Sequence, residues 1–367
     1  MITDKMTYRW LWSCLIAGSL LLLMAACSDG SEEEPQPSPS QPEEDSKLEL
    51  RAVTRTAGVF SMPEANNKIQ VYLTTKETNV PGSFTYNTTS GWESNLSVKE
   101  ESQYYLYGYM PGSITCNEQT PAETNDYSKG INLQLTGLPA ITLDDVSVLV
   151  GVQRVANRTT AEAPDTTKVT EGQYGFRTGI KGQNFVNLLM AHLYSKLKLS
   201  FKIGADYAEL RSIHVKEVKL TSNYGDGSVT VSLKNGQGLE TPAFPVGTEG
   251  VTGKDVTIFK SSLTVPEVVL DKALATSENS VQTLEIPAYC RPIAVVANQT
   301  YNLTLTTTYD VWDRKRNLGE RTSKNKIRLS MASVKPGNEN NIVLTVMPTY
   351  LYILSDNDLD NPTITVN

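Results

Sequence analysis

The sequence predicts an all-β fold, with two antiparallel β-sandwich domains in tandem, on the basis of three observations. Apolar and polar residues alternate over short runs that are rich in β-branched and aromatic side chains. Turn-forming residues separate these runs, and sustained helical periodicity is rare. The clearest runs are 69–73, 197–203, 229–233, 303–305 and 342–346, and the clearest turns are 225–227, 234–236 and 335–338. Half-buried strands of this kind are typical of sheets that pack face to face.

The chain begins with a segment typical of an exported lipoprotein. Lys5 and Arg9 precede an apolar run at 11–26, and two alanines lead into Cys27. An apolar run of this length fits a signal peptide better than a mature transmembrane helix. We therefore expect residues 1–27 to be a lipoprotein signal peptide and Cys27 to be acylated, for example with palmitate. The alternative is that 11–26 is an ordinary membrane anchor and Cys27 an unmodified thiol.

Residues 28–47 are expected to form a disordered tether. They are rich in Pro, Ser and Gln, carry seven acids and one lysine, and hold too few apolar side chains to offset the entropy of ordering. Most of the formal net charge of -7 therefore lies here, and residues 48–367 carry a formal charge of -2. The folded part thus offers no general electrostatic attraction to nucleic acid. Acidic residues directly after Cys27 resemble the surface-export signal of Bacteroidota lipoproteins, which implies the cell surface, at the outer face of the outer membrane.

The body that follows the tether is long enough for two domains, each with its own core. Apolar residues thin out at 159–182, where Ala, Pro, Asp, Thr and Gly dominate, and this composition suits a long loop before a second domain. We therefore expect an N-terminal sandwich at 48–182 and a C-terminal sandwich at 183–367. The one helix candidate is 185–196, although it runs directly into an alternating strand.

Candidate catalytic and metal-binding residues are scarce. His192 and His214 are the only histidines, and neither belongs to a recognised nucleophile motif or to a metal-binding spacing. The alternate acids in 356–361 resemble the start of a calcium loop, but no glutamate closes it. The sequence therefore predicts a protein that is not an enzyme and that holds no cofactor and no metal. Outside the leader, Cys116 and Cys290 are the only thiols, and the sequence leaves open whether they pair.

Several segments together resemble the fimbrillin family of Bacteroidota, and they follow the family's order over most of the chain. They are the lipoprotein start, the strand Tyr104–Pro111, the segment Phe185–Leu199, and the closing Lys335–Asn338 before Ile342–Val346. The resemblance implies two transthyretin-like β-sandwich domains and a subunit of a type V pilus, a surface fimbria used for adhesion and biofilm formation. It implies as partners other pilin subunits, the outer membrane through the precursor's lipid, and a host or bacterial surface ligand.

The resemblance also implies how such a subunit assembles. An arginine-specific protease removes the tether together with the first strand, and the opened groove takes up a strand from a neighbouring subunit. Two arginines lie at a suitable place. Arg51 is preferred because it follows directly on the tether and has the small Ala52 after it, and Arg55, followed by Thr56, is the alternative. The alternative is that this segment is an ordinary strand with two solvent-facing arginines and is not cleaved.

The expected donor strand is the C-terminal run 361–367, in which Ile364 and Val366 share one face. The run 350–354 is a second candidate, and either run can instead be the last strand of its own domain. The sequence leaves open whether the subunit belongs to the stalk, the tip or the anchor of the fibre.

Two other functions remain open from the sequence. A pilus anchor lipoprotein would keep its lipid at Cys27. A surface glycan-binding lipoprotein of a polysaccharide-uptake system would share the signal, the acidic tether and the β-sandwich body. In that case the tyrosines of 104–109 would form an exposed platform for sugar rings, whereas tyrosines at alternate strand positions are otherwise packing residues with their hydroxyl groups in water.

Overall fold

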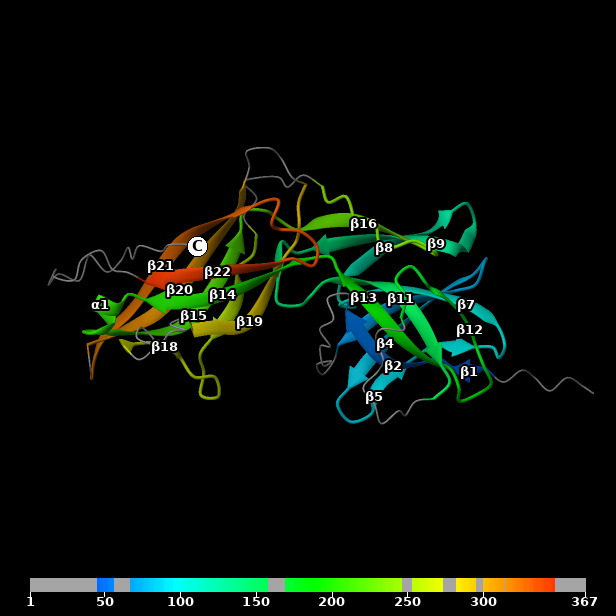
Figure 1. Cartoon of the computed structure of the whole chain (residues 1–367), viewed down its shortest axis with the longest axis horizontal. Helices are drawn as coiled ribbons and strands as arrows, with labels where there is room; N and C mark the ends of the chain where they lie inside the picture. Colours follow the sequence, from blue (N-terminus) through cyan, green and yellow to red (C-terminus); the bar gives the residue numbers. More distant parts are fainter. Residues whose placement is uncertain are drawn as a thin grey trace, which may run out of the picture. The chain divides into compact units, whose positions relative to one another are not determined.

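The structure is a computed structural model, and it describes residues 45–55, 67–157, 169–245, 253–272, 282–294, 300–313 and 315–346. In this part the regular secondary structure is almost all strand, with one four-residue helix, which confirms the predicted all-β class (Figure 1). The elements are β1 (Ser46–Lys47), β2 (Glu49–Arg55), β3 (Lys68–Thr74), β4 (Asn79–Asn87), β5 (Gly91–Ser94), β6 (Ser97–Val98), β7 (Gln103–Met110), β8 (Thr115–Glu123), β9 (Asp126–Leu138), β10 (Ile141–Thr142), β11 (Ser147–Val155), β12 (Gly175–Arg177), β13 (Phe185–His192), β14 (Ser195–Ile203), α1 (Ala205–Ala208), β15 (Ser212–Ser222), β16 (Gly227–Lys234), β17 (Val256–Lys260), β18 (Val268–Leu270), β19 (Gln282–Cys290), β20 (Thr300–Asp313), β21 (Arg316–Ser330) and β22 (Glu339–Val346).

The largest sheet has eight strands in the order β2-β13-β11-β7-β3-β4-β5, with β12 paired to β7. Residues of its two edge strands, β2 and β5, lie in contact, so the sheet curls on itself. The side chains enclosed on its inner side form one cluster, which we call the curled-sheet core. Its members are Leu48, Leu50, Ile69, Val71, Leu73, Phe84, Leu96, Val98, Leu106, Leu149, Val152, Phe176, Val186, Leu188 and Met190.

A three-stranded sheet in the order β16-β9-β8 shares a second core with the large sheet. Tyr107 and Val148 come from the large sheet, and Leu133 and Val231 come from the small one; all four are at most 1% exposed. β16 pairs with β9 although it follows β14 and β15 in the chain. A strand from the second half of the sequence therefore completes a sheet built from the first half.

β1 and β6 pair in a short two-stranded sheet, and the remaining strands form a sandwich of two sheets. One sheet has the order β10-β19-β14-β22, and the other has the order β17-β15-β20-β21, with β18 paired to β15. Alternate side chains from both sheets make one core, in which Leu199, Leu220, Leu305 and Leu344 are almost fully buried. The sandwich form predicted for this part of the chain is therefore present, while the transthyretin-like topology stays a prediction.

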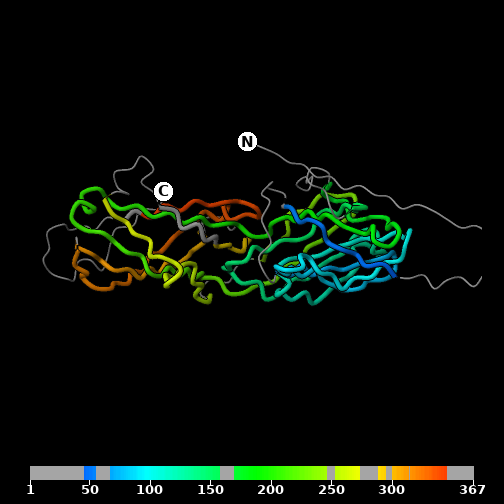
Figure 2. The backbone as a smooth tube through the Cα atoms, turned by 90° about the horizontal axis from the view of Figure 1, so that it is seen from below, coloured from blue at the N-terminus to red at the C-terminus, as the bar shows by residue number. Residues whose placement is uncertain are grey.

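Two strand pairs are parallel, which differs from the antiparallel sheets that the sequence predicts. β2 runs parallel to β13, and β22 runs parallel to β14; the other strand pairs in the described part are antiparallel. The blue β2 and the red β22 can be followed in Figure 2. Both are edge strands, and β13 and β14 follow each other directly in the chain. The first and the last long strands of the described part therefore occupy equivalent edge positions.

The helix candidate at 185–196 is wrong, because this segment forms β13 and the beginning of β14. Both faces of β13 are largely buried, so its apolar residues run almost continuously and imitate a helical face. β13 also pairs with β2 and β11, so the large sheet extends about ten residues beyond the expected boundary at Gly182. The domains 48–182 and 183–367 stay a prediction, with β13 and β16 belonging to sheets of the first part.

Candidate assembly site at the first strand

The first long strand buries one of its faces completely. Leu48, just before β2, is 0% exposed, and Leu50 and Ala52 within it are 6% and 4% exposed. The residues between them are only half-buried, because successive side chains of a strand point to opposite faces. Leu48 and Leu50 belong to the curled-sheet core. Alternate residues of this segment therefore place an apolar row inside the N-terminal part.

Hydrogen bonds hold this strand along its length. The Leu48 amide donates to the Leu96 carbonyl at 3.0 Å, and the Glu49 amide donates to the Asn184 carbonyl at 2.9 Å. At the far end, the Thr54 hydroxyl donates to the Leu188 carbonyl at 3.2 Å. In the described part β2 forms a ladder with β13 alone, so its other edge contributes to no sheet. A strand paired on one edge can leave or be exchanged without breaking other ladders.

The two candidate cleavage sites differ in their place on this strand. Leu50 is opposite Val186 and Ala52 is opposite Asn187, so Arg51 is the extra residue of a β-bulge in the middle of β2. Arg55 is the last residue of β2 and is opposite Met190. Cleavage after Arg51 would divide the strand, whereas cleavage after Arg55 would detach it whole. Thr56 lies outside the described residues.

Other predicted site residues also lie outside the described part of the chain. These are the lipidation site Cys27, the donor-strand residues Ile364 and Val366, the alternative donor run 350–354 and the calcium-like acids of 356–361. In the described part, no helix is long and apolar enough to cross a membrane. No group of three potential metal ligands among His, Cys, Asp and Glu was found there either.

The structure gives each histidine a polar partner that the sequence did not reveal. His192 Nδ1 lies 2.9 Å from Asp145 Oδ2, and both side chains are largely buried. His214 Nδ1 lies 3.0 Å from Glu267 Oε2, and its Nε2 lies 3.3 Å from the Ser212 hydroxyl. These partners are distant along the chain except for Ser212, so sequence spacing could not identify them.

A serine, a histidine and a glutamate in this order also occur in hydrolase triads. Here Ser212 and His214 are alternate residues of one strand, so they lie on the same face and in contact. The His214 ring stacks on Trp312 with a centroid distance of 5.2 Å. We interpret the cluster as a structural link between β15, β20 and the segment before β18.

The tyrosine-rich strand β7 forms no sugar platform at its buried positions. Tyr107 is 0% exposed and donates its hydroxyl to the Tyr127 carbonyl at 2.8 Å; Tyr109 is 4% exposed and donates to the Ile114 carbonyl at 3.0 Å. Burial raises the pKa of both phenols. These hydroxyl groups bond to the protein instead of to water, in contrast to the expectation for packing tyrosines.

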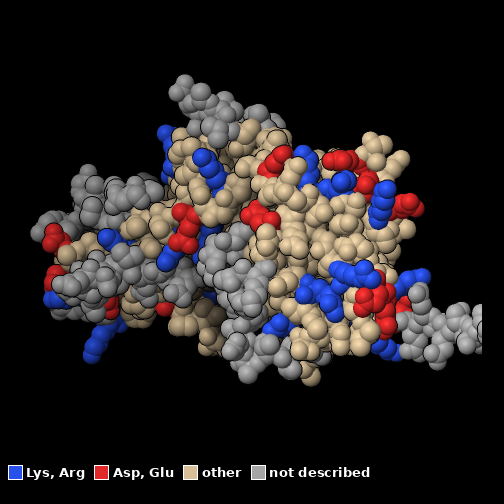
Figure 3. Space-filling model, turned by 45° about the vertical axis from the view of Figure 1, so that its right-hand side comes forward, with Lys and Arg blue, Asp and Glu red and all other residues tan. Residues whose placement is uncertain are grey.

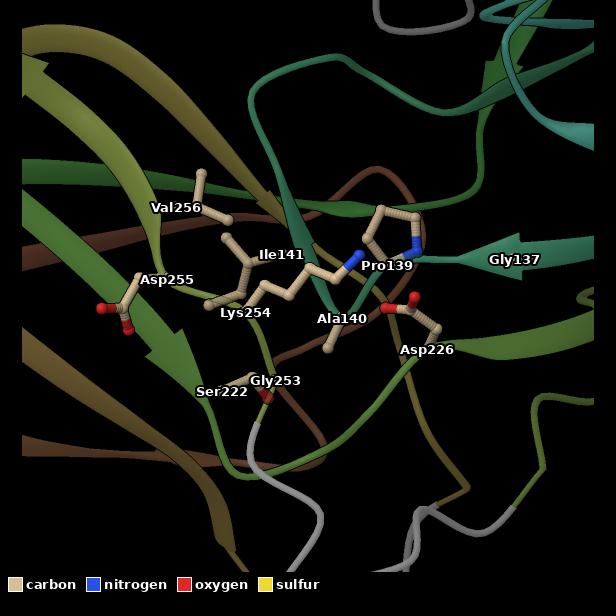
Figure 4. A pocket seen from close by; sticks show the side chains of 10 residues that line it. All are labelled: Gly137, Pro139, Ala140, Ile141, Ser222, Asp226, Gly253, Lys254, Asp255 and Val256. Carbon is tan, nitrogen blue, oxygen red and sulfur yellow. The ribbon is translucent and has the colours of Figure 1, made fainter.

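A cavity of about 350 Å³ lies where the β9–β10 connection meets β15 and the segment before β17 (Figure 4). In Figure 4 the Lys254 side chain extends toward Pro139, and the carboxylate of Asp226 lies on the same side. The residues that line it include no histidine or cysteine. Its polar lining comes from Ser222, Asp226, Lys254 and Asp255.

Cys116 and Cys290 are both free thiols, and they lie in different sheets, on β8 and β19.

On the face drawn in Figure 3, basic and acidic side chains of the described residues are interspersed. This distribution agrees with the nearly balanced charge of the body.

No protein-family model matches the sequence, and a comparison with curated proteins found no match. The structure is similar to solved structures of Bacteroides proteins named for cell adhesion and fimbriae. One has a candidate role in cell adhesion and comes from Bacteroides uniformis, with 13% identity and a TM-score of 0.39 over 89% of this chain and 98% of that one. A fimbrial protein from Bacteroides vulgatus has 11% identity and a TM-score of 0.38, over 87% and 98% of the two chains. At such low scores and identities, similarity in function does not follow from similarity in structure.

Proposed function

We propose that the chain is a subunit of a cell-surface fimbria that polymerises by exchange of its first strand. The observation that supports this function best is the position of β2. It buries Leu50 and Ala52 in the N-terminal part, yet in the described residues it forms a ladder with β13 alone. A strand with these two properties is both needed to complete the core and separable from the rest of the sheet.

Removal of β2 would leave a site that favours another strand. The carbonyl groups and amides on the edge of β13 that faces β2 would lose their partners. The side chains that contact Leu48 and Leu50 would become exposed to water. Burial of one leucine side chain is worth roughly 1.5–3 kcal/mol, and each lost backbone hydrogen bond adds to this cost. An incoming strand with alternate apolar residues would restore both terms, which is the physical basis of β-augmentation.

We propose Arg55 as the cleavage site that activates the subunit, in preference to Arg51. A cut after Arg51 would leave Ala52, Val53 and Thr54 attached to the body, where they pair with β13 and occupy part of the site. A cut after Arg55 would free the whole strand.

The other parts of the proposal concern segments at the two ends of the chain. Cys27 would carry the lipid that holds the precursor at the outer membrane until cleavage. The run with Ile364 and Val366, or else 350–354, would enter the site of the next subunit. The protein itself would act as a structural and adhesive component and not as an enzyme.

Limited digestion of the full chain tests the proposal. The full chain in detergent, and its Arg55→Ala and Arg51→Ala variants, are treated with an arginine-specific protease. The products are examined by unheated gel electrophoresis and N-terminal sequencing. We expect polymer ladders and an N-terminus at Thr56 for the unmodified chain and for Arg51→Ala, and monomers for Arg55→Ala.

Two results would contradict parts of the proposal. A cleaved chain that stays monomeric, with the 46–55 segment still bound, would exclude strand exchange. Polymers whose subunits begin at Ala52 would support strand exchange but reject Arg55 as the site.

A further inference from the structure

The outer face of β21 carries a row of cations. Lys324, Lys326 and Arg328 are exposed and alternate with Ser323, Ile327 and Leu329, which are buried, and with the half-buried Asn325. Alternate residues of a strand lie about 7 Å apart on the same face. The three positive charges therefore form a regular line along one strand.

Next to this row runs a strip of small polar side chains on β20. Asn302, Thr304 and Thr306 are the register partners of Arg328, Lys326 and Lys324. All three are half-buried and lie on the outer side of β20, because Tyr301, Leu303, Leu305 and Thr307 face inward. The face thus offers hydroxyl and amide groups beside each cation, and its strip holds no aromatic or aliphatic side chain.

The cations of the row have no acidic partner in the part of the chain that the structure describes. Of the acids on β20 and β21, Asp310 and Glu320 lie 2.8 Å and 3.3 Å from the Lys216 ammonium group. On β15, Glu217 lies 2.8 Å from Lys219 and 3.6 Å from Lys260. Asp255 accepts a hydrogen bond from Thr221. The row is therefore an uncompensated positive line on a body whose formal net charge is -2.

The geometry points to this face as a binding surface for an extended anionic polysaccharide. We define the cation row as Lys324, Lys326 and Arg328. A linear glycan with carboxylate or sulfate groups can place successive charges along the row, while its hydroxyl groups bond to the strip on β20. The row and the strip run side by side along two paired strands, and an extended ligand gains from several weak contacts in series.

The chemistry of the strip distinguishes this occupant from two other polyanions. Single-stranded nucleic acid is commonly held by aromatic side chains that stack on bases, and the strip provides none. A protein partner usually needs buried aromatic or aliphatic anchors at the centre of its interface, and these are also missing from the strip. The inference does not depend on strand exchange, because β21 lies in the other part of the fold.

Binding of the full chain in detergent to immobilised polysaccharides tests the inference. The probes are heparin for sulfate groups, polygalacturonate for carboxylate groups, and dextran as a neutral chain. The row variant carries Lys324→Gln, Lys326→Gln and Arg328→Gln. The matched control removes three exposed cations elsewhere, through Lys129→Gln, Lys198→Gln and Lys335→Gln. The row variant and the control variant have the same net charge. Thermal unfolding checks that each is folded. If the row variant does not fold, the single Lys326→Gln variant replaces it.

We expect the unmodified chain and the control to bind heparin, polygalacturonate or both, and not dextran. The row variant should bind about tenfold more weakly, the factor that corresponds to about 1.4 kcal/mol. Added salt should reduce binding of the unmodified chain more than that of the row variant. The preferred probe then identifies sulfate or carboxylate as the recognised group.

Three outcomes would overturn the inference. These are equal loss of binding in the row variant and the control, binding to dextran as strong as to the charged chains, and no binding to either charged chain. Tight binding of single-stranded DNA that is lost only in the row variant would identify nucleic acid as the occupant instead. Polymer formation after cleavage should be the same in all variants, so this test and the test of strand exchange fail independently.

Discussion

The hydroxyl of Thr54 donates a hydrogen bond to the carbonyl oxygen of Leu188, which lies 134 residues further along the chain. This bond joins the end of the first long strand to the middle of β13. At the other end of the fold, β22 takes the corresponding place beside β14. β13 and β14 are consecutive in the chain but lie in different sheets. The first and the last long strands of the described part therefore each pair with one of two consecutive strands, and each forms one ladder only.

Leu50→Ala should destabilise the protein by about 2–5 kcal/mol, because it removes a buried side chain from the curled-sheet core. Urea denaturation of the full chain measures the free energy of unfolding. Val80→Ala is the control, since Val80 is 52% exposed and its truncation should change stability by at most about 0.5 kcal/mol. Equal effects of the two substitutions would show that Leu50 does not hold β2 in the core.

Cys116 and Cys290 should react with alkylating agents at very different rates. Cys290 is 0% exposed, and burial raises the pKa of its thiol well above the ordinary value. The reactive thiolate is therefore scarce at that position, and reagents cannot reach it. Cys116 is half-buried at the surface of β8. At about pH 8, iodoacetamide should modify Cys116 first, and Cys290 only after denaturation, as peptide mass mapping would show. Equal modification of both thiols in the folded chain would contradict this prediction.

Local alternation was sufficient to predict the strand-rich class, because a strand with one buried face shows its period of two directly. It was insufficient where both faces are buried, as in β13, since a continuous apolar run has no period to read. Parallel pairing of β2 with β13 depends on contacts between distant segments, and no local pattern encodes it. The same holds for β16, which returns to β9 from the second half of the chain.

The candidate site was predictable in part for the same reason. The two arginines could be identified from the sequence, whereas the burial of Leu48, Leu50 and Ala52 is shown by the structure. The rank of the two arginines stays a prediction, to which the structure adds the register shift at Arg51 that the sequence did not show. The cation row on β21 was also missed: three alternate cations in a sequence resemble any solvated strand until the partners of neighbouring acids are known.

Gly108→Ala should destabilise the N-terminal part, because β7 has no room for a side chain at this position. A Cβ atom there would lie 2.5 Å from the Gln70 carbonyl oxygen and 2.9 Å from Val71 Cγ1. The carbonyl belongs to the backbone of the paired strand β3, so it cannot move aside as a flexible side chain could. We expect a loss of about 1–3 kcal/mol, as for other overpacked core positions.

Gly91→Ala is an informative comparison for Gly108→Ala. At Gly91 no atom lies within 4 Å of an added Cβ, but the backbone angle φ is 78°. Its cost should come from backbone strain alone, about 1 kcal/mol. Thermal unfolding of both variants measures these losses of stability. A loss for Gly108→Ala that is no larger than the loss for Gly91→Ala would contradict the steric argument.

Tyr194→Phe should lower stability near neutral pH but not in strong alkali. The Tyr194 hydroxyl donates to the Pro139 carbonyl at 2.7 Å, and the side chain is 1% exposed. Loss of this hydrogen bond should cost about 1 kcal/mol at pH 7. Burial raises the pKa of Tyr194 in the folded state, while the phenol of the unfolded chain ionises at about pH 10.

The sign of the pH effect follows from proton binding. Above about pH 10 the folded state holds the Tyr194 proton and the unfolded state releases it, so the free energy of unfolding falls as pH rises. One pH unit above the pKa of the unfolded chain, this loss is about 1.4 kcal/mol for one group. It is absent from Tyr194→Phe, so the difference between the two proteins should vanish or reverse near pH 11. Urea denaturation at pH 7 and near pH 11 measures the difference, and a constant deficit of the variant at both values would show that Tyr194 ionises equally in the folded and unfolded states.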